Sequence, residues 1–194
     1  KKILLVGGCG FIGHNLAIHL KKMGADPVIV DSLAVNNILS FADNEIKNKK
    51  LYSSILNNRI ELLNSNKIKL IIQDARDYHA ISKIYQDINP DIIIHLAAVS
   101  HANKSNKDPH STFDHSFRTL ENTLDYAKKN KTHTIYMSSS MVYGNFESED
   151  VKEDRTCKPI GIYGTLKYSG ELLVKAYSDV FDLPYTIIRP SALY

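Results

Sequence analysis

Six short runs of apolar residues, separated by longer segments, constrain the fold of this chain more than any other feature. The first four runs consist largely of Ile, Leu and Val, and the last two, "THTIYMSS" and "YTIIRP", also contain aromatic and polar residues. Such runs are typical of strands that are covered on both faces, as in a parallel sheet. We predict strands at residues 2–6, 27–31, 68–72, 91–98, 132–139 and 185–190.

The segments between the apolar runs have the length and the spacing of helices. We predict helices at residues 11–23, 42–64, 78–87, 110–130 and 161–181. Strict alternation of strand and helix indicates an α/β fold with a doubly wound parallel sheet. The connection from Asn36 to Asn66 is longer than a minimal crossover needs, and its Leu and Ile residues recur at roughly helical spacing. We therefore predict an enlarged helical connection there, with a packing role.

A glycine-rich loop joins the first predicted strand to the first predicted helix. In "LLVGGCGFIGHNL", Gly7, Gly10 and Gly13 are spaced three apart, and Gly8 begins a G-x-G-x-x-G pattern. Glycine allows a tight turn, a close approach of the backbone to a pyrophosphate, and close packing of the helix on its strand. The helix N-terminus then offers backbone amides to the anion. The loop therefore predicts a dinucleotide-binding site.

An acidic residue, Asp31, ends the next predicted strand. It follows the glycines at about the distance at which such a residue binds the hydroxyls of the adenosine ribose. Its carboxylate would repel a 2′-phosphate, and no Arg follows it directly, so we predict NAD rather than NADP. The alternative is that Asp31 only caps a helix. Cys9, within the loop, needs only to be small, and we predict no nucleophilic role for it.

Size and composition exclude several classes of function. A chain of 194 residues with 43% hydrophobic and 23% charged residues is typical of one soluble globular domain. Its 24 basic and 21 acidic residues give a formal charge of +3, too small and too dispersed to predict binding to nucleic acid or to a membrane surface. The apolar runs are shorter than a membrane helix of about 20 residues, and the first is too short for a signal peptide.

The cysteines and histidines point to neither disulfides nor metal. The two cysteines, Cys9 and Cys157, form no CxxC pattern, which favours a reducing, cytoplasmic setting. The eight histidines have no ligand spacing such as HExxH. We therefore predict no metal site.

The motif "YGTLK" is the candidate catalytic motif. It places Tyr163 and Lys167 four residues apart in a predicted helix, so that both side chains lie on one face. A neighbouring ammonium and a positive nicotinamide ring would both favour the phenolate, which makes Tyr163 a candidate acid/base for a sugar or alcohol hydroxyl. Such a pair occurs often by chance. Here the pair is significant because it follows the fifth predicted strand in a chain that also has a dinucleotide-binding loop.

Seven motifs together carry a resemblance to a known family. They are "GGCGFIG", Asp31, "QDARD", "HLAAVSH", "SSSMVYG", "YGTLK" followed by Glu171, and "RPSALY". With them the whole chain resembles the extended short-chain dehydrogenase/reductase family, the NAD-dependent sugar-nucleotide epimerases and dehydratases, and especially its UDP-glucose 4-epimerase-like members. The resemblance implies that residues 1–194 are the NAD-binding Rossmann domain of a larger two-lobed enzyme, without its C-terminal substrate-binding region. It also implies a homodimer formed through the helices at 110–130 and 161–181.

The resemblance also implies a role for individual residues. The catalytic residues would be Ser139, which hydrogen-bonds the reacting oxygen, Tyr163 as the base, and Lys167, which binds the nicotinamide ribose and tunes the tyrosine. The cofactor-binding residues would be Gly7, Gly10, Phe11, Ile12, Gly13, Asp31, Ser32, Asp74, Ala75, Leu96, Ala97, Ala98, Tyr163, Lys167 and Pro190. The substrate-facing residues would be Ser100, Ser140 and Met141. We predict a polar or packing role for His101 and leave it out of the catalytic set.

Three residues depart from the family pattern. Val6 stands where a Thr usually precedes the glycines, and Ser116 stands where an Asn is usual. We expect both to alter hydrogen bonds that support the fold near the cofactor. Ala192 replaces the Asn of the family's "RPxNxYGP" motif, so the motif does not identify the sugar.

The two residues after Ser139 bear on the type of reaction. Sugar-nucleotide 4,6-dehydratases of this family carry Asp-Glu there, because eliminating water needs an additional acid and base. Here the positions hold Ser140 and Met141, neither of which can move a proton in that way. We therefore predict a nucleotide-sugar epimerase, which oxidises a sugar hydroxyl and returns the hydride to the other face. Alternatives are a reductase, dehydrogenase or other dehydratase of the same family, and a non-catalytic NAD-binding scaffold.

Overall fold

The chain divides into two compact units that we describe separately. The computed structural model describes residues 1–35, 37–41, 48–99, 102–146 and 150–191. The first unit comprises Lys1–Ala97 and the second Ala98–Tyr194. The assignment of residues 1–194 to one NAD-binding domain stays a prediction. Among the described residues, no helix is both long enough and apolar enough to cross a membrane.

The first unit contains four parallel strands in the order β3-β2-β1-β4. The strands are β1 (Lys2–Val6), β2 (Asp26–Asp31), β3 (Lys69–Ile72) and β4 (Ile92–His95). The register pairs Val6 with Val30 on one side and with His95 on the other. Because all four strands are parallel, their carboxyl ends lie along one edge of the sheet.

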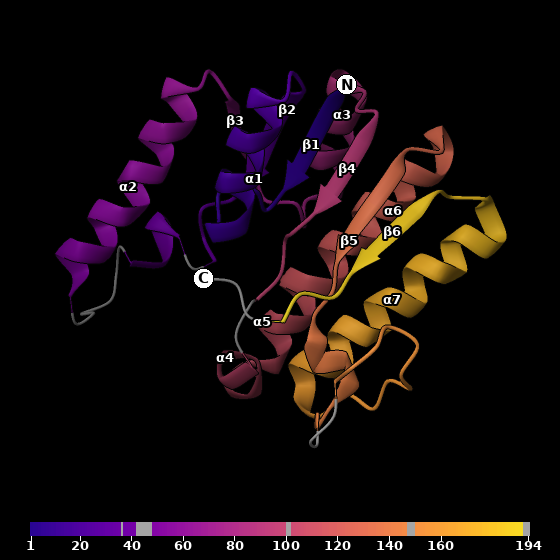
Figure 1. Cartoon of the computed structure of the whole chain (residues 1–194). Coiled ribbons are helices and arrows are strands. Elements are labelled where there is room, and N and C mark those ends of the chain that lie inside the picture. The colour runs from indigo at the N-terminus through magenta and orange to yellow at the C-terminus, as the bar shows by residue number, and fades with distance from the viewer. Residues whose placement is uncertain (36, 42–47, 100–101, 147–149, 192–194) are drawn as a thin grey trace. The chain divides into compact units, whose positions relative to one another are not determined.

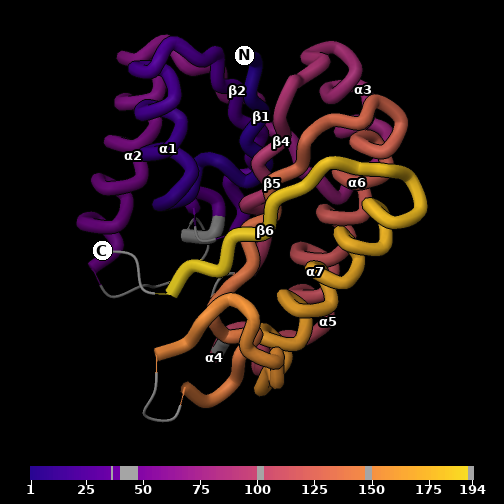
Figure 2. The backbone as a smooth tube through the Cα atoms, turned by 45° about the vertical axis from the view of Figure 1, so that its right-hand side comes forward, coloured from indigo at the N-terminus to yellow at the C-terminus, as the bar shows by residue number. Residues whose placement is uncertain are grey.

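Helices cover both faces of this sheet. The helices α1 (Phe11–Lys22) and α2 (Lys49–Ser65) lie on one face, and α3 (Tyr78–Ile88) lies on the other (Figures 1 and 2). Leu4, Leu5 and Ile29 in the central strands are fully buried, as the apolar runs predict. The outer strand β3 differs, because Ile72 is 65% exposed. The prediction that every strand is covered on both faces is therefore wrong for β3. It is also wrong for β6 (Tyr185–Ile188) of the second unit, where Ile188 is 41% exposed.

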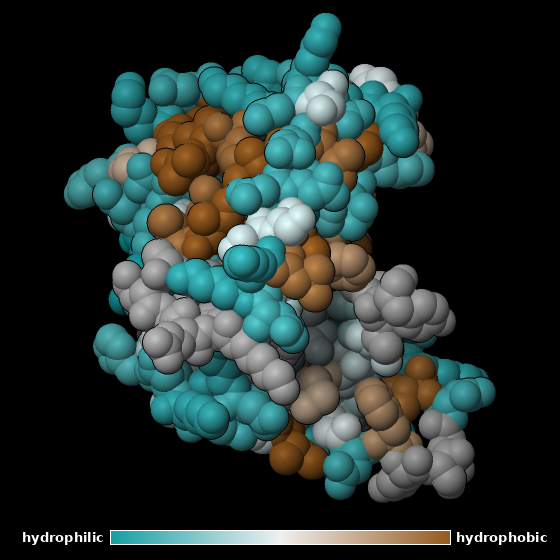
Figure 3. Space-filling view, turned by 90° about the vertical axis from the view of Figure 1, so that its left-hand side faces the viewer, coloured by the Kyte–Doolittle hydropathy of each residue, from teal (hydrophilic) through white to brown (hydrophobic). Residues whose placement is uncertain are grey.

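The long connection between β2 and β3 is helical. It contains a short 3-10 helix, η1 (Ile38–Phe41), and then α2, which begins at Lys49 rather than at the predicted residue 42; residues 42–47 lie outside the described part of the chain. Leu56 and Leu63 are buried, whereas Leu51 and Ile55 are 60% and 42% exposed. Only part of the predicted apolar stripe therefore packs on the unit, and hydrophobic side chains reach the surface on the face shown in Figure 3.

The second unit pairs two parallel strands and covers them with two long helices. The strands are β5 (His133–Met137) and β6 (Tyr185–Ile188), and Met137 lies opposite Ile188. The helices α6 (Thr119–Asn130) and α7 (Gly161–Phe181) lie on the same face of this pair (Figure 2). Three strands, β4, β5 and β6, end two or three residues before their predicted ends. The residues that follow them turn into loops, which carry several of the predicted site residues.

The helix predicted at residues 110–130 is divided. It consists of α5 (Pro109–Phe113), one π-helical turn, η2 (Asp114–Arg118), and α6. In the π turn the hydroxyl of Ser116 accepts a hydrogen bond from the Val99 amide at 3.3 Å. A further short helix, α4 (Ala102–Lys107), has the polar sequence ANKSNK. The sequence predicted no helix there because these residues show no apolar periodicity.

A glycine lets α7 pack closely on β5. A Cβ atom at Gly170 would overlap the hydroxyl of Tyr136 and lie 3.1 Å from Leu120 Cδ2. Tyr136 is only 3% exposed, so its ring cannot turn away into solvent. The contact holds the middle of α7, just after "YGTLK", against the strand that leads to the three serines.

Candidate active site

The first unit brings the residues after three of its strands to one edge. The Gly7 amide donates to the Val30 carbonyl of β2 at 2.8 Å, and the Leu96 amide donates to the Val6 carbonyl of β1 at 2.8 Å. Asp31 is the last residue of β2. The glycine loop, Asp31 and the start of the segment after β4 therefore lie beside one another. This is the edge at which ligands bind in open α/β sheets.

Each predicted loop glycine has a distinct steric environment. Gly7 has φ +75°, and a Cβ on it would lie 2.6 Å from the backbone of Ala97. A Cβ on Gly13 would overlap the backbone of Gly8. Gly10 differs, because a Cβ there would meet no atom nearer than the Gly7 carbonyl oxygen at 3.8 Å. Gly7 and Gly13 are thus needed for packing within the unit, whereas Gly10 leaves open space at the start of α1.

The N-terminus of α1 suits an anion such as the pyrophosphate of a dinucleotide. Gly10 is its N-cap residue, no side chain among the described residues caps it, and the first turn contains no acidic residue. Phe11 and Ile12 follow, and Phe11 is 51% exposed. The amides of this turn point along the helix axis and, with the helix dipole, favour a negative group. The residues present therefore fit a dinucleotide.

Asp31 is held by backbone amides. Its two carboxylate oxygens accept hydrogen bonds from the amides of Cys9, at 2.9 Å, and Leu33, at 2.8 Å. Burial raises the pKa of Asp31, and these two hydrogen bonds oppose that shift. The next helix begins only at Ile38, so Asp31 does not cap a helix. Ser32 follows it, and the Ser32 hydroxyl accepts a bond from the Ala34 amide at 3.3 Å. Each carboxylate oxygen retains acceptor capacity for a ribose hydroxyl.

Asp74 and Ala75 follow β3, where the sequence predicts contacts with the adenine. The Asp74 carboxylate accepts from the Arg76 amide at 2.9 Å and from the Arg76 guanidinium, with Nη2 at 2.6 Å. The ion pair is about one third exposed. Ala75 is buried. Arg76 therefore fixes the orientation of the carboxylate, a role that the sequence did not indicate.

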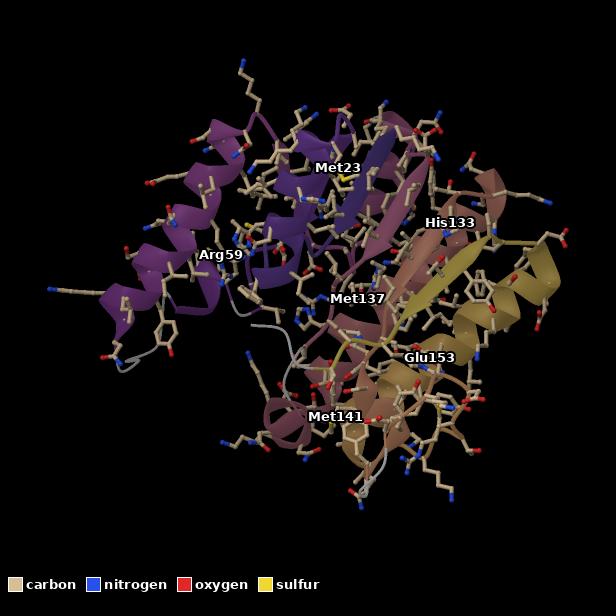
Figure 4. All side chains as sticks on the ribbon, viewed as in Figure 1. Met23, Arg59, His133, Met137, Met141 and Glu153 are labelled. Carbon is tan, nitrogen blue, oxygen red and sulfur yellow. The ribbon has the colours of Figure 1, made fainter. Side chains whose placement is uncertain are left out.

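In the second unit, the three serines connect β5 to a short 3-10 helix, η3 (Ser140–Tyr143). Ser139 is the N-cap of η3, and its hydroxyl accepts from the Met141 amide at 3.2 Å. The Ser140 amide donates to the Pro190 carbonyl at 2.9 Å. This bond joins a predicted substrate-facing residue, Ser140, to a predicted cofactor-binding residue, Pro190. Figure 4 labels Met137 and Met141, which flank the serines.

The helix α7 presents the predicted base to this loop. The side chain of Ser139 lowers the pKa of Tyr163, whereas burial, the larger effect, raises it. Lys167 lies one turn further along α7 and donates to the Met137 carbonyl at 2.7 Å. Its ammonium also lies over the Tyr136 ring, 5.2 Å from the centroid. Burial lowers the pKa of Lys167 to about 8. The three predicted catalytic residues are therefore brought together within this unit.

The remaining predicted positions in or next to this unit are less fully defined. Ser100 and His101 lie outside the described residues. Ala98 begins the second unit, directly after Ala97. The side chain of Met141 is 37% exposed, and a Cβ on Gly164 would lie 2.8 Å from the Met141 carbonyl oxygen. Gly164 is thus required where α7 passes this loop.

The sequence indicated no role for a buried ion pair beside the serines. Glu171 is fully buried and accepts from the Ser138 hydroxyl at 2.5 Å. Arg189 donates to Glu171 twice, through Nε at 2.8 Å and Nη2 at 2.7 Å, and to the Tyr143 hydroxyl at 2.8 Å. The one signal in the sequence is that Glu171 lies eight residues after Tyr163, on the same face of α7.

Comparisons with known proteins identify the family. The NAD dependent epimerase/dehydratase family matches residues 3–194. Protein CapI of Staphylococcus aureus is 32% identical over 195 residues, which cover 100% of this chain and 54% of CapI. The dTDP-D-glucose 4,6-dehydratase of Dictyostelium discoideum is 29% identical over 206 residues, which cover 100% of this chain and 44% of the dehydratase. This chain therefore spans about half the length of these curated relatives.

A solved structure supports the same assignment. UDP-glucuronic acid 4-epimerase from Bacillus cereus, in complex with UDP-glucuronic acid and NAD, is 31% identical with a TM-score of 0.77, over 97% of this chain and 56% of that one. The likeness confirms the predicted doubly wound parallel α/β fold. Together with the motifs and with the site in each unit, it shows that the chain belongs to the NAD-dependent epimerase/dehydratase family, with NAD as its cofactor.

Proposed function

We propose that this protein is an NAD-dependent nucleotide-sugar epimerase. The observation that carries the proposal is the grouping of Ser139, Tyr163 and Lys167, a hydroxyl, a phenol and a buried ammonium. This set can remove a proton from a sugar hydroxyl and stabilise the oxygen as it becomes a carbonyl. NAD, when bound, would supply the hydride acceptor and the hydride donor for the sugar carbon, so that the carbon could be inverted with no net change in the cofactor.

The first unit would bind the adenosine and pyrophosphate parts of the cofactor. The amides at the N-terminus of α1 bind the pyrophosphate, because the space at Gly10 is open and the helix dipole favours negative charge. Asp31 accepts hydrogen bonds from the ribose hydroxyls and repels a 2′-phosphate. Asp74 and Ala75 contact the adenine, with Arg76 holding the Asp74 carboxylate in place.

The second unit would perform the proton transfer. Tyr163 as phenolate accepts the proton of the sugar hydroxyl, and Ser139 donates a hydrogen bond to the same oxygen. The Lys167 ammonium stabilises the phenolate and binds the nicotinamide ribose. Because burial lowers the pKa of Lys167 only to about 8, the ammonium form predominates at pH 7. The charge that favours the phenolate is therefore present at neutral pH.

The positions after Ser139 favour epimerisation over 4,6-dehydration. Elimination of water needs an acid and a base besides Tyr163, and the Asp-Glu of the dehydratases is replaced by Ser140 and Met141. An epimerase would need no acid and base beyond Ser139, Tyr163 and Lys167, because the same groups could serve the sugar oxygen in both directions. The epimerase from Bacillus cereus, at 31% identity, supports this choice, and the dehydratase from Dictyostelium discoideum makes 4,6-dehydration the alternative to test.

A panel of nucleotide-sugars tests the proposal. The protein is incubated with UDP-glucose, UDP-glucuronic acid, UDP-N-acetylglucosamine and dTDP-glucose, and the products are resolved by chromatography. We expect a 4-epimer, no net change in NADH absorbance, and NAD that co-purifies tightly. A 4-keto-6-deoxy product would instead indicate a dehydratase. Net consumption or production of NADH without an epimer would indicate a reductase or dehydrogenase.

We also propose that two copies of the protein pair through α6 and α7. Large apolar side chains are exposed along α7: Leu172 is 49%, Val180 69% and Phe181 39% exposed. Burial of such surface between two copies would stabilise a dimer. Sedimentation measurements on the protein and on Leu172→Glu test this proposal. A dimer that becomes monomeric in the variant supports it, and a monomer in both contradicts it.

A further inference from the structure

Glu171 is a fully buried carboxylate that the proposed chemistry does not use. It lies on α7 two turns after Tyr163 and one turn after Lys167. Its charge is neutralised by the two hydrogen bonds from Arg189, whose side chain is 15% exposed. Buried ions are tolerated when they are paired and hydrogen-bonded in this way. The ion pair is thus complete without a further partner.

Glu171 nevertheless accepts a third hydrogen bond, from a residue of the serine loop. The Ser138 hydroxyl lies 2.5 Å from Glu171 Oε1, a short distance typical of a bond to a charged acceptor. Ser138 is 2% exposed and lies between β5 and η3. The bond therefore attaches the serine loop to α7 at a site that solvent does not reach.

The residue before Ser138, Met137, attaches the end of β5 to α7 at a second point. Its carbonyl accepts a hydrogen bond from the Lys167 ammonium at 2.7 Å, and Lys167 precedes Glu171 by four residues, or about 6 Å along the helix axis. One hydrogen bond would let the chain pivot about the contact. Two bonds from adjacent residues, to points one turn apart on α7, fix the direction in which the chain enters the loop, and so the place of the next residue, Ser139, whose side chain lowers the pKa of Tyr163.

Arg189 extends this attachment to η3. Its Nη1 donates to the Tyr143 hydroxyl, at 2.8 Å, and to the Glu153 carbonyl, at 3.0 Å, and the guanidinium lies over the Tyr143 ring. Figure 4 labels Glu153. The ion pair therefore holds the start of the loop through Ser138 and the end of η3 through Tyr143.

We propose that Ser138 and Glu171 are positioning residues, which hold the Ser139 hydroxyl beside Tyr163. This inference rests on the proposed function, because it assigns Ser139 and Tyr163 to the chemistry. Ser138 and Glu171 touch neither cofactor nor sugar in this assignment. They act through Ser139, and Arg189 forms the ion pair with Glu171.

The experiment follows the ionisation of Tyr163 in the NAD-bound protein. Tyrosine labelled with 13C at Cζ reports phenolate formation by NMR, and the Tyr163→Phe spectrum identifies the signal. Ser138→Ala removes one hydroxyl and leaves the Glu171–Arg189 pair intact, so it changes no charge. The signal is followed as the pH is raised, and the pH at which half of Tyr163 is phenolate is its midpoint. In Ser138→Ala we expect this midpoint to move upward by at least half of the shift that Ser139→Ala produces, because the interaction with the Ser139 hydroxyl that favours the phenolate is weakened.

Two further variants separate positioning from general damage. In the double variant Ser138→Ala, Ser139→Ala the midpoint should equal that of Ser139→Ala alone, because Ser138 acts only through Ser139. Thr123→Ala is the matched control. It removes another fully buried hydroxyl of the second unit, one that donates to the Thr119 carbonyl at 3.0 Å. It should leave the Tyr163 midpoint unchanged.

The outcomes distinguish this inference from the proposed function. If Ser139→Ala moves the midpoint and Ser138→Ala does not, the positioning role is overturned and the proposed function stands. Additive shifts in the double variant, or an equal shift in Thr123→Ala, also overturn the positioning role. If Ser139→Ala itself has no effect, both the inference and the assignment of Ser139 to the chemistry fail.

Discussion

The two units build their parts of the site by different means. In the first unit the loop is shaped by backbone: Gly7 approaches the backbone of Ala97, and Asp31 is held by two amides. In the second unit the site depends on side chains that contact one another across three elements, with the buried pair of Glu171 and Arg189 beside the serines. A backbone site tolerates changes of side chain but no added Cβ. A side-chain network tolerates neither the loss of a charge nor that of a hydroxyl.

The largest expected effect is on catalysis in the second unit. Tyr163→Phe should lower the rate of epimerisation about 10²–10⁴-fold, because the proton acceptor is lost while the ring remains. Binding of NAD, measured by calorimetry, should persist because the residues proposed for its adenosine and pyrophosphate parts are unchanged. Tyr168→Phe, on the same helix, is the control and should keep its activity. Full activity in Tyr163→Phe would rule out the proposed mechanism.

The buried ion pair should dominate the stability of the second unit. Glu171→Ala leaves the Arg189 guanidinium without its carboxylate, which should lower the free energy of unfolding by about 3–5 kcal/mol. Asp87→Ala breaks the exposed Lys83–Asp87 pair and should cost less than about 1 kcal/mol. Urea unfolding of both variants measures the difference. If both variants lost the same free energy of unfolding, the buried ion pair would contribute no more to stability than the exposed one.

Lys167 should reduce stability in a pH-dependent way. Burial lowers its pKa to about 8 from 10.5, so between these values the unfolded chain binds the proton and the folded chain does not. The stability of the protein should therefore rise with pH across this interval. We compare the free energy of unfolding of Lys167→Met with that of the parent protein. The difference, variant minus parent, should be larger at pH 7 than at pH 10.5 by up to about 3 kcal/mol.

Denaturant titrations of the parent protein and of Lys167→Met, repeated across this pH range, give the difference in the free energy of unfolding. Other groups that titrate equally in the two proteins contribute equally to both free energies, so their contributions cancel in the difference. A difference that does not vary with pH would show that the Lys167 ammonium is not disfavoured by folding. The same variant should lose activity, because the charge beside Tyr163 is absent. The residue thus lowers stability below pH 8 while serving the chemistry.

The smallest effect tests the backbone design of the first unit. Gly7 and Gly24 both have positive φ, but a Cβ on Gly7 would lie 2.6 Å from the Ala97 backbone, and one on Gly24 would have nothing within 4 Å. Alanine at either position suffers the same kind of backbone strain. Gly7→Ala should therefore be less stable than Gly24→Ala by about 1–3 kcal/mol, from overpacking. Thermal unfolding compares them, and equal stabilities would contradict the close approach.

The difference between the units also explains how much could be predicted from the sequence. The glycine spacing and Asp31 lie within one strand–turn–helix unit and the strand after it, so a short stretch of sequence reports the geometry. The doubly wound fold followed from the apolar runs. Strand ends were overestimated. β4 stops at His95 although apolar residues continue into the loop, and β5 stops at Met137, before the serines that the prediction had included in the strand.

Contacts between distant residues were harder to predict. Ser138 and Arg189 are 51 positions apart, and both contact Glu171. No periodicity links residues at that separation, and a charged residue at the end of a strand usually faces solvent. Similarly, the apolar stripe of α2 predicted packing for Leu51 and Ile55, which are exposed. Helical spacing shows which side chains share a face but does not show how much of the face is covered.

The contact between Gly170 and Tyr136 restricts the order in which these positions can change during evolution. A methyl group at position 170 overlaps the tyrosine hydroxyl and also lies 2.7 Å from the ring carbon Cζ, so Tyr136→Phe alone does not make room for it. An aliphatic residue at position 136 would make room, but it would also remove the ring beneath the Lys167 ammonium. Any lineage that exchanges both residues must therefore pass through an intermediate with an altered lysine environment. We expect glycine and an aromatic residue to be inherited together at these two positions.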